Sequence, residues 1–215
     1  MGGNYQKPVL ITGATAQWTD AFTPEALRER HSQLEVLATQ SFQIRNYGMS
    51  DPTCPAVRHV PTSLGRFLAN GLQLTAEETP PGAFFDKFYV FDSSVMRADV
   101  RGKMRAGDLR QHVLLPSDFH DPGIDLILAV GGNGSGTQFH RHTDAWNVLV
   151  SGHKRWFLTP GDRIPLPSYP ASYGMGIEHY VTKLFPALIE TDQPQHCVQR
   201  PGELMYVPEG WFHGA

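Results

Sequence analysis

Short apolar runs separated by glycine and proline fill the second half of the chain. We expect strands at residues 88–91, 125–130, 137–142, 146–150, 155–158, 197–199 and 204–207. Many short strands with turn residues between them are typical of a β-sandwich or β-barrel. One helix is expected near residues 177–184. The turn Ser151-Gly152-His153 predicts a hairpin between two of these strands.

The first part of the chain mixes helical and strand patterns. Thr23 followed by Pro24 is typical of a helix start, and we expect this helix to end near His31. A second helix, capped by Thr62 or Ser63, is predicted by apolar residues at helical spacing: Leu64, Phe67, Leu68 and Leu72. Three short strands are expected at residues 8–11, 34–38 and 42–45. We therefore expect an α/β extension, residues 1–87, packed on a mainly β barrel formed by residues 88–215.

Composition narrows the class of protein. A chain of 215 residues with 40% hydrophobic and 18% charged residues is expected to form one globular unit. Its net charge of −3 argues against non-specific nucleic-acid binding. We interpret the basic residues between Arg97 and Arg110 as a solvated face. Two cysteines, Cys54 and Cys197, make no disulfide framework.

Nothing in the chain predicts a membrane segment. The longest apolar run is far too short to cross a bilayer, and the first residues lack the pattern of a secretory signal. The compartment stays open: cytoplasmic or nuclear by default, luminal only if the true N-terminus is missing from this sequence. The oligomeric state has no signal in the sequence.

Two distant segments carry the candidate chemistry. Gly134 precedes His140 and His142, and a second run from Gly202 ends in His213. On a strand, residues two apart point to one face, so His140 and His142 are expected side by side. Asp144 would share that face and is an alternative to His142. Three imidazoles gathered from two segments predict a divalent metal site with open coordination positions.

These motifs resemble those of the JmjC-domain (cupin-like) oxygenases, which use Fe(II) and 2-oxoglutarate. The likeness is to the branch with a bifunctional arginine demethylase and lysyl hydroxylase, and to jumonji-domain protein eight. It covers the chain from about Lys7 to its end. The matching pieces are Tyr89–Ser94, Ser135-Gly136-Thr137 with His140, Ala145-Trp146-Asn147, Gly152–Trp156 and Pro201–His213. The resemblance implies a double-stranded β-helix, the jelly-roll fold of the cupins.

The resemblance also implies roles for individual residues. His140 and His213 would be iron ligands, and the Lys154 ammonium would pair with the distal carboxylate of 2-oxoglutarate. Three polar residues would hydrogen-bond to the same co-substrate: Tyr89, Thr137 and Asn147. A lysine inside a closed barrel is physically sensible only with an anion beside it.

Two features depart from the family pattern. The position of the usual carboxylate ligand, two residues after the first histidine, holds His142, so either His142 or Asp144 is the second ligand. Alternatively, His142 and Asp144 themselves form the His-x-Asp pair. Cupin barrels also continue beyond the last metal histidine, whereas this sequence stops at Ala215. We therefore expect C-terminal strands to be missing and a sheet edge to be unpaired.

The first functional hypothesis is an Fe(II)- and 2-oxoglutarate-dependent oxygenase of hydroxylase or demethylase type, acting with O2 on a protein side chain or a small target. The second is a three-histidine cupin metalloenzyme that does not use 2-oxoglutarate. The third is a non-catalytic interaction protein that keeps the fold. The sequence does not identify the substrate, because specificity in such folds lies in loops such as 109–123 and 160–176.

Overall fold

The computed structural model describes residues 6–13, 20, 22–40, 59–70, 88–92, 126–137, 139–163 and 177–215. Within these ranges the chain is mostly β-sheet with few helices, which confirms the predicted jelly-roll class. The strands form two sheets of three strands and one sheet of four.

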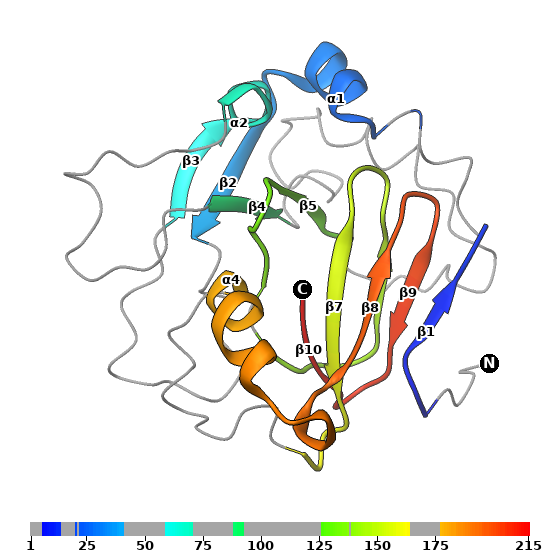
Figure 1. Ribbon diagram of the computed structural model, residues 1–215. Coiled ribbons are helices and arrows are strands. Elements are labelled where there is room, and N and C mark those ends of the chain that lie inside the picture. Colours follow the sequence, from blue (N-terminus) through cyan, green and yellow to red (C-terminus); the bar gives the residue numbers. More distant parts are fainter. Residues whose placement is uncertain are drawn as a thin grey trace.

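The two three-stranded sheets pack on each other. One has the order β1 (Val9–Ile11), β9 (Leu204–Val207), β6 (Ala145–Val148), and the other the order β10 (Phe212–Gly214), β7 (Lys154–Thr159), β8 (Gln195–Gln199). Figure 1 shows β7, β8, β9 and β1 running along one another. The buried side chains of the packed core are Trp156, Leu158, Met205, Val207, Trp211 and Ala215.

The opposite face of β7 is covered by a short helical segment. This segment consists of α4 (Ile177–His179), the π-helix Tyr180–Leu184 and the 3-10 turns Phe185–Ala187 and Glu190–Asp192. Tyr180 and Phe185 pack on Phe157 in edge-to-face contacts, with ring centroids 5.2 and 5.0 Å away. Because alternate residues of a strand face opposite ways, Phe157 lies under the helical segment while its neighbours Trp156 and Leu158 lie between the sheets.

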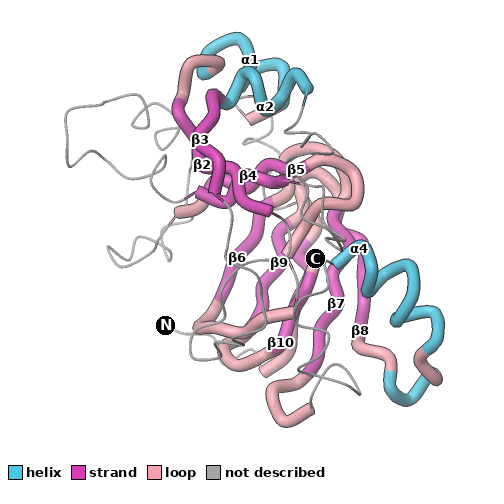
Figure 2. The backbone as a smooth tube through the Cα atoms, turned by 90° about the vertical axis from the view of Figure 1, so that its left-hand side faces the viewer, coloured by secondary structure: helices cyan, strands magenta, loops and turns pink. Residues whose placement is uncertain are grey.

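The third sheet lies beside two helices. Its order is β3 (His59–Ser63), β2 (Glu35–Gln40), β4 (Phe88–Asp92), β5 (Leu128–Gly131), and it packs with α1 (Pro24–His31) and α2 (Leu64–Asn70). In Figure 2 these helices stand at one end of the molecule, away from β7 and β8. The Thr23 hydroxyl accepts a hydrogen bond from the Ala26 amide at 3.1 Å, which caps α1 where the sequence predicted it.

The predicted division at residue 87 falls inside a sheet. β2 precedes this position and β4 follows it, yet the two strands pair from Ala38 with Val90 to Gln40 with Phe88. Likewise β1 is hydrogen-bonded to β9, near the other end of the chain. The boundary between an extension and a barrel therefore stays a prediction.

Three expectations about elements need correction. The turn at Gly152 joins no hairpin, because β6 pairs with β9 whereas β7 pairs with β10 and β8 in another sheet. The strand expected at 137–142 is reduced, among its described residues, to a bridge between His140 and His213. The sequence reading also missed β3 and β10. The strand expected at 42–45 and the basic residues 97–110 lie outside the described residues.

Within the described ranges, every helix is too short or too polar to cross a lipid bilayer.

Candidate metal centre

Backbone pairing brings the two motif segments together. The His140 amide donates to the His213 carbonyl at 2.9 Å, and the His213 amide donates to the His140 carbonyl at 2.8 Å. Thr137 and Ala215 exchange an equivalent pair of bonds at 2.8 and 3.0 Å. A further bond runs from the Gly210 amide to the His142 carbonyl at 3.0 Å. The positions of the histidine backbones are therefore set by main-chain hydrogen bonds across 73 residues of sequence separation between His140 and His213.

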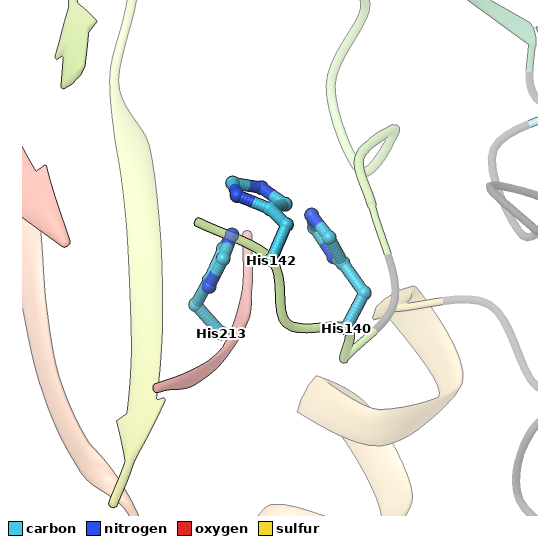
Figure 3. A group of neighbouring side chains, drawn as sticks. All are labelled: His140, His142 and His213. Carbon is cyan, nitrogen blue, oxygen red and sulfur yellow. The ribbon is translucent and has the colours of Figure 1, made fainter. Parts of the chain in front are cut away.

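The three histidine side chains converge on one point. The ring centroids are 4.3 Å apart for His140 and His213, 4.8 Å for His142 and His213, and 5.2 Å for His140 and His142. Their nearest ligand atoms all lie within 4.8 Å of one another. Figure 3 shows two rings rising from one segment and the third from the β10 side. His140 and His213 are buried, whereas His142 is exposed.

Two of the rings are held in a tautomer that suits metal binding. The Nδ1 atom of His213 is 3.0 Å from the Trp211 carbonyl, and that of His142 is 2.7 Å from the Thr143 carbonyl. A carbonyl oxygen only accepts, so each Nδ1 must carry the proton and donate. The Nε2 atom of each neutral ring then keeps its lone pair for a ligand bond.

Electrostatics also favour a neutral His213. Burial lowers the pKa of His213 well below its ordinary value, and the nearby His140, His142 and Lys154 lower it further. The hydrogen bond to the Trp211 carbonyl opposes this shift and does not outweigh it. Because metal ligation requires the neutral imidazole, this ring needs no deprotonation at neutral pH.

Asp144 is placed away from the three imidazoles. Its Oδ1 atom accepts hydrogen bonds from the Glu209 amide at 2.7 Å and from the Tyr206 hydroxyl at 3.1 Å. It is not a member of the histidine cluster. These bonds connect the His142 segment to the turn that precedes His213, so the carboxylate supports the arrangement of the two segments.

A further polar side chain lies on the strand that pairs with β10. Lys154 begins β7 and is half-buried, and its ammonium is 4.4 Å from the centroid of the Trp156 ring. Burial lowers the pKa of Lys154 to about 8. Within the described residues no carboxylate pairs with this ammonium. A cation that is partly desolvated and has no carboxylate beside it is costly, which favours an anionic ligand next to it.

The other residues expected around a co-substrate are Tyr89, Asn147 and Thr137. The Tyr89 hydroxyl and the Asn147 side-chain oxygen are both buried without a hydrogen-bond partner among the described residues. Burial raises the pKa of Tyr89 well above its usual value, so the phenol keeps its proton and can donate. Thr137 is buried beside Ala215 through its backbone bonds. The hydroxyls of Thr62 and Tyr180 are buried without a partner as well, so an unpartnered atom in the described residues does not by itself mark a ligand site.

The contacts that two buried residues, Trp156 and Gln199, make near the site were not predicted from the sequence. Trp156 is a core aromatic, and its ring also lies against Lys154 and 6.1 Å from the His213 ring. The contact between Trp156 and Lys154 could have been predicted from the sequence, because residues 154 and 156 share a strand face. Gln199 is fully buried and hydrogen-bonds to Trp156, and no motif in the sequence marks it.

Comparison with known proteins identifies the family of the chain. The family model for the cupin-like domain matches residues 4–215, and the chain belongs to this family. The chain is 24% identical over 237 residues to the lysine-specific demethylase JMJ21 of Arabidopsis thaliana, covering 97% of this chain and 22% of the relative. It is 26% identical over 237 residues to the bifunctional arginine demethylase and lysyl-hydroxylase psr-1 of Caenorhabditis elegans, covering 96% and 51%.

A shorter match is to JmjC domain-containing protein 8 of Homo sapiens, 33% identical over 86 residues, which covers 40% of this chain and 31% of the relative. The chain thus spans between about a fifth and about half of the length of these curated relatives. The suspected relationship to the JmjC proteins is confirmed.

We predict that Gly136→Ala destabilises the pairing on which the centre rests. A Cβ atom at position 136 would collide with the carbonyl of Ala215 and lie 3.1 Å from Ile177 Cγ2. We expect a loss of about 1–3 kcal/mol in the free energy of unfolding, measured by chemical denaturation.

Gly132→Ala is the matched control, because a Cβ atom there meets nothing within 4 Å. This variant should unfold within about 0.5 kcal/mol of the parent protein. Equal stability of the two variants would contradict the close approach of residues 136 and 215.

Proposed function

We propose that the protein is an Fe(II)- and 2-oxoglutarate-dependent oxygenase, with His140, His142 and His213 as the metal ligands. The observation that carries this proposal is the combination of three converging imidazoles with a half-buried lysine that has no anionic partner among the described residues. The names of the similar proteins, which are demethylases and a hydroxylase, support the same reaction class.

The histidine cluster fits a divalent ion. Metal–imidazole bonds are about 2.1 Å long, so three ligand nitrogens on one side of an ion lie about 3.0–3.4 Å apart. The ligand atoms lie within 4.8 Å of one another, so the rings must move inward to bind one ion. Imidazole suits iron among other transition metals. Three neutral rings leave the ion its full charge of two, one unit more positive than a set that includes a carboxylate.

The polar group beyond the cluster fits 2-oxoglutarate. The Lys154 ammonium would neutralise the carboxylate of the keto acid that points away from the metal, and the Tyr89 hydroxyl would donate a hydrogen bond to the same anion. The Asn147 amide, turned about its Cγ atom, would present its NH2 group instead of the unpartnered oxygen. Thr137, at the end of the glycine-rich loop, is the remaining candidate.

When bound, iron, keto acid and O2 together supply the oxidation of a substrate C–H bond, with the keto acid converted to succinate and carbon dioxide. The residues of this chain bind and orient. Lys154 and Tyr89 fix the far end of the keto acid, and burial of His140 and His213 excludes water from one side of the centre. The exposed His142 marks the side that is open to a substrate.

We propose a protein side chain as the substrate. The support comes from the relatives, whose names specify lysine and arginine as the residues on which they act. A small molecule with a similar amino or guanidino group is the alternative. An exposed ligand such as His142 gives either kind of substrate access to the centre.

Lys154→Ala tests the co-substrate. Protein loaded with Fe(II) should form succinate from 2-oxoglutarate and O2, and the variant should need at least tenfold more 2-oxoglutarate for half-maximal rate, because a buried charge pair is lost. Lys183→Ala, at an exposed lysine, is the control and should behave like the parent protein.

Each failure has a distinct meaning. Folded protein that binds iron but forms no succinate would favour the three-histidine cupin that does not use 2-oxoglutarate. Protein that binds no metal at all would favour the non-catalytic interaction protein.

The pKa of Lys154 predicts how the binding of 2-oxoglutarate depends on pH. In the empty site the pKa is about 8, and a bound dianion raises it. Below pH 8 the lysine is already protonated, so affinity is at its maximum. Above pH 8 binding must take up a proton, and we expect the dissociation constant to rise about tenfold per pH unit.

Isothermal titration with Mn(II)-saturated protein between pH 7 and 9.5 measures this dependence. Lys154→Arg is the control, because a guanidinium keeps its charge throughout this range. The same pH dependence in both proteins would show that another group is responsible.

A further inference from the structure

Gln199 lies inside the molecule, where the two three-stranded sheets meet. It is the last residue of β8, and its side chain is fully buried. A primary amide in such a place is costly unless all of its polar groups are paired. β8 also places it directly opposite Lys154 on β7.

Every polar group of this amide is used. The Gln199 Oε1 atom accepts a hydrogen bond from the Trp156 indole nitrogen at 2.8 Å. The Nε2 atom donates to the carbonyl of Asn147 and to the carbonyl of Glu203, each at 2.9 Å. Asn147 belongs to β6 and Trp156 to β7, so the amide joins strands of two different sheets. An interior amide with complete hydrogen bonding has one defined orientation.

The groups held by Gln199 adjoin the proposed keto-acid site on two sides. The Trp156 ring lies between the Lys154 ammonium, 4.4 Å from its centroid, and the His213 ring, 6.1 Å away. A rotation of the indole would remove the surface on which the ammonium rests. On the other side, the Asn147 carbonyl accepts from Gln199 while the Asn147 side-chain oxygen stays unpartnered.

We propose that Gln199 is a positioning residue for 2-oxoglutarate: it fixes Asn147 and, through Trp156, Lys154 in one mutual arrangement. This inference rests on the proposed function, since it concerns the same co-substrate. None of the hydrogen-bond partners of Gln199 is a proposed metal ligand. Its loss should therefore weaken the binding of the keto acid while leaving metal binding intact.

An amide is the group that this place requires. Leucine would leave the indole N–H without a partner and would remove one hydrogen bond from each of the two carbonyl oxygens, although the Glu203 carbonyl would keep its bond from the Leu149 amide. Glutamate would accept from Trp156 but could not donate to both carbonyls, and it would bury a charge. The requirement for one acceptor and two donors therefore selects glutamine over side chains of similar size.

The test compares Gln199→Leu with the parent protein by isothermal titration. Mn(II) is titrated first, and 2-oxoglutarate is then titrated into the Mn(II)-saturated protein. We expect the dissociation constant of 2-oxoglutarate to rise at least tenfold and that of Mn(II) to change less than threefold. Gln195→Leu is the matched control, because Gln195 is on the same strand and exposed. It should leave both constants unchanged.

Trp156→Phe gives a second test that keeps an aromatic ring in place. This variant removes only the indole donor, so it should weaken 2-oxoglutarate binding by a smaller factor than Gln199→Leu does. It should also remain folded even if Gln199→Leu does not fold. The double variant should be no weaker than Gln199→Leu alone, because both changes break the same bond.

The outcomes separate this inference from the function on which it rests. Equal losses of metal and 2-oxoglutarate affinity would overturn the positioning role and leave a merely structural one. Unchanged affinity for 2-oxoglutarate in both single variants would also overturn it. If the parent protein binds Mn(II) but no 2-oxoglutarate, the proposed function itself fails.

Discussion

The pairing of the backbone at His140 with the backbone at His213 is the constraint on which the site depends. Four hydrogen bonds, between these residues and between Thr137 and Ala215, join two segments that are remote in sequence. They fix the backbone positions of the histidines. Hydrogen bonds to the Trp211 and Thr143 carbonyls then orient the rings of His213 and His142. The cluster is thus produced by main-chain geometry, and the side chains need little further ordering to bind an ion.

The interior of the protein contains two kinds of polar group. Gln199 and the Trp156 indole are buried and hydrogen-bonded, so they stabilise the contact between the sheets. The Tyr89 hydroxyl and the Asn147 side-chain oxygen are buried without partners, and burial lowers the pKa of Lys154. Such unpaired groups reduce stability in the absence of a ligand, which is a common property of binding sites. A dianionic co-substrate would satisfy several of them together.

The elements with strong local signals could be predicted from the sequence. The Thr23-Pro24 cap placed α1 and the apolar run at residues 204–207 placed β9 at their observed bounds. The spacing of the histidines predicted that His140, His142 and His213 converge. β10 was missed because a three-residue strand after Pro208 and Gly210 has no periodicity to detect. Asp144 and Gln199 act through tertiary hydrogen bonds, which leave no local pattern.

X-ray absorption at the iron edge tests the central claim most directly, in protein loaded with one equivalent of Fe(II). The multiple scattering of imidazole rings counts the histidine ligands. Three imidazoles are predicted in the parent protein and two in His142→Ala. Fewer than three in the parent protein, or an unchanged number in the variant, would contradict the assignment of His140, His142 and His213 as the ligands of a single ion.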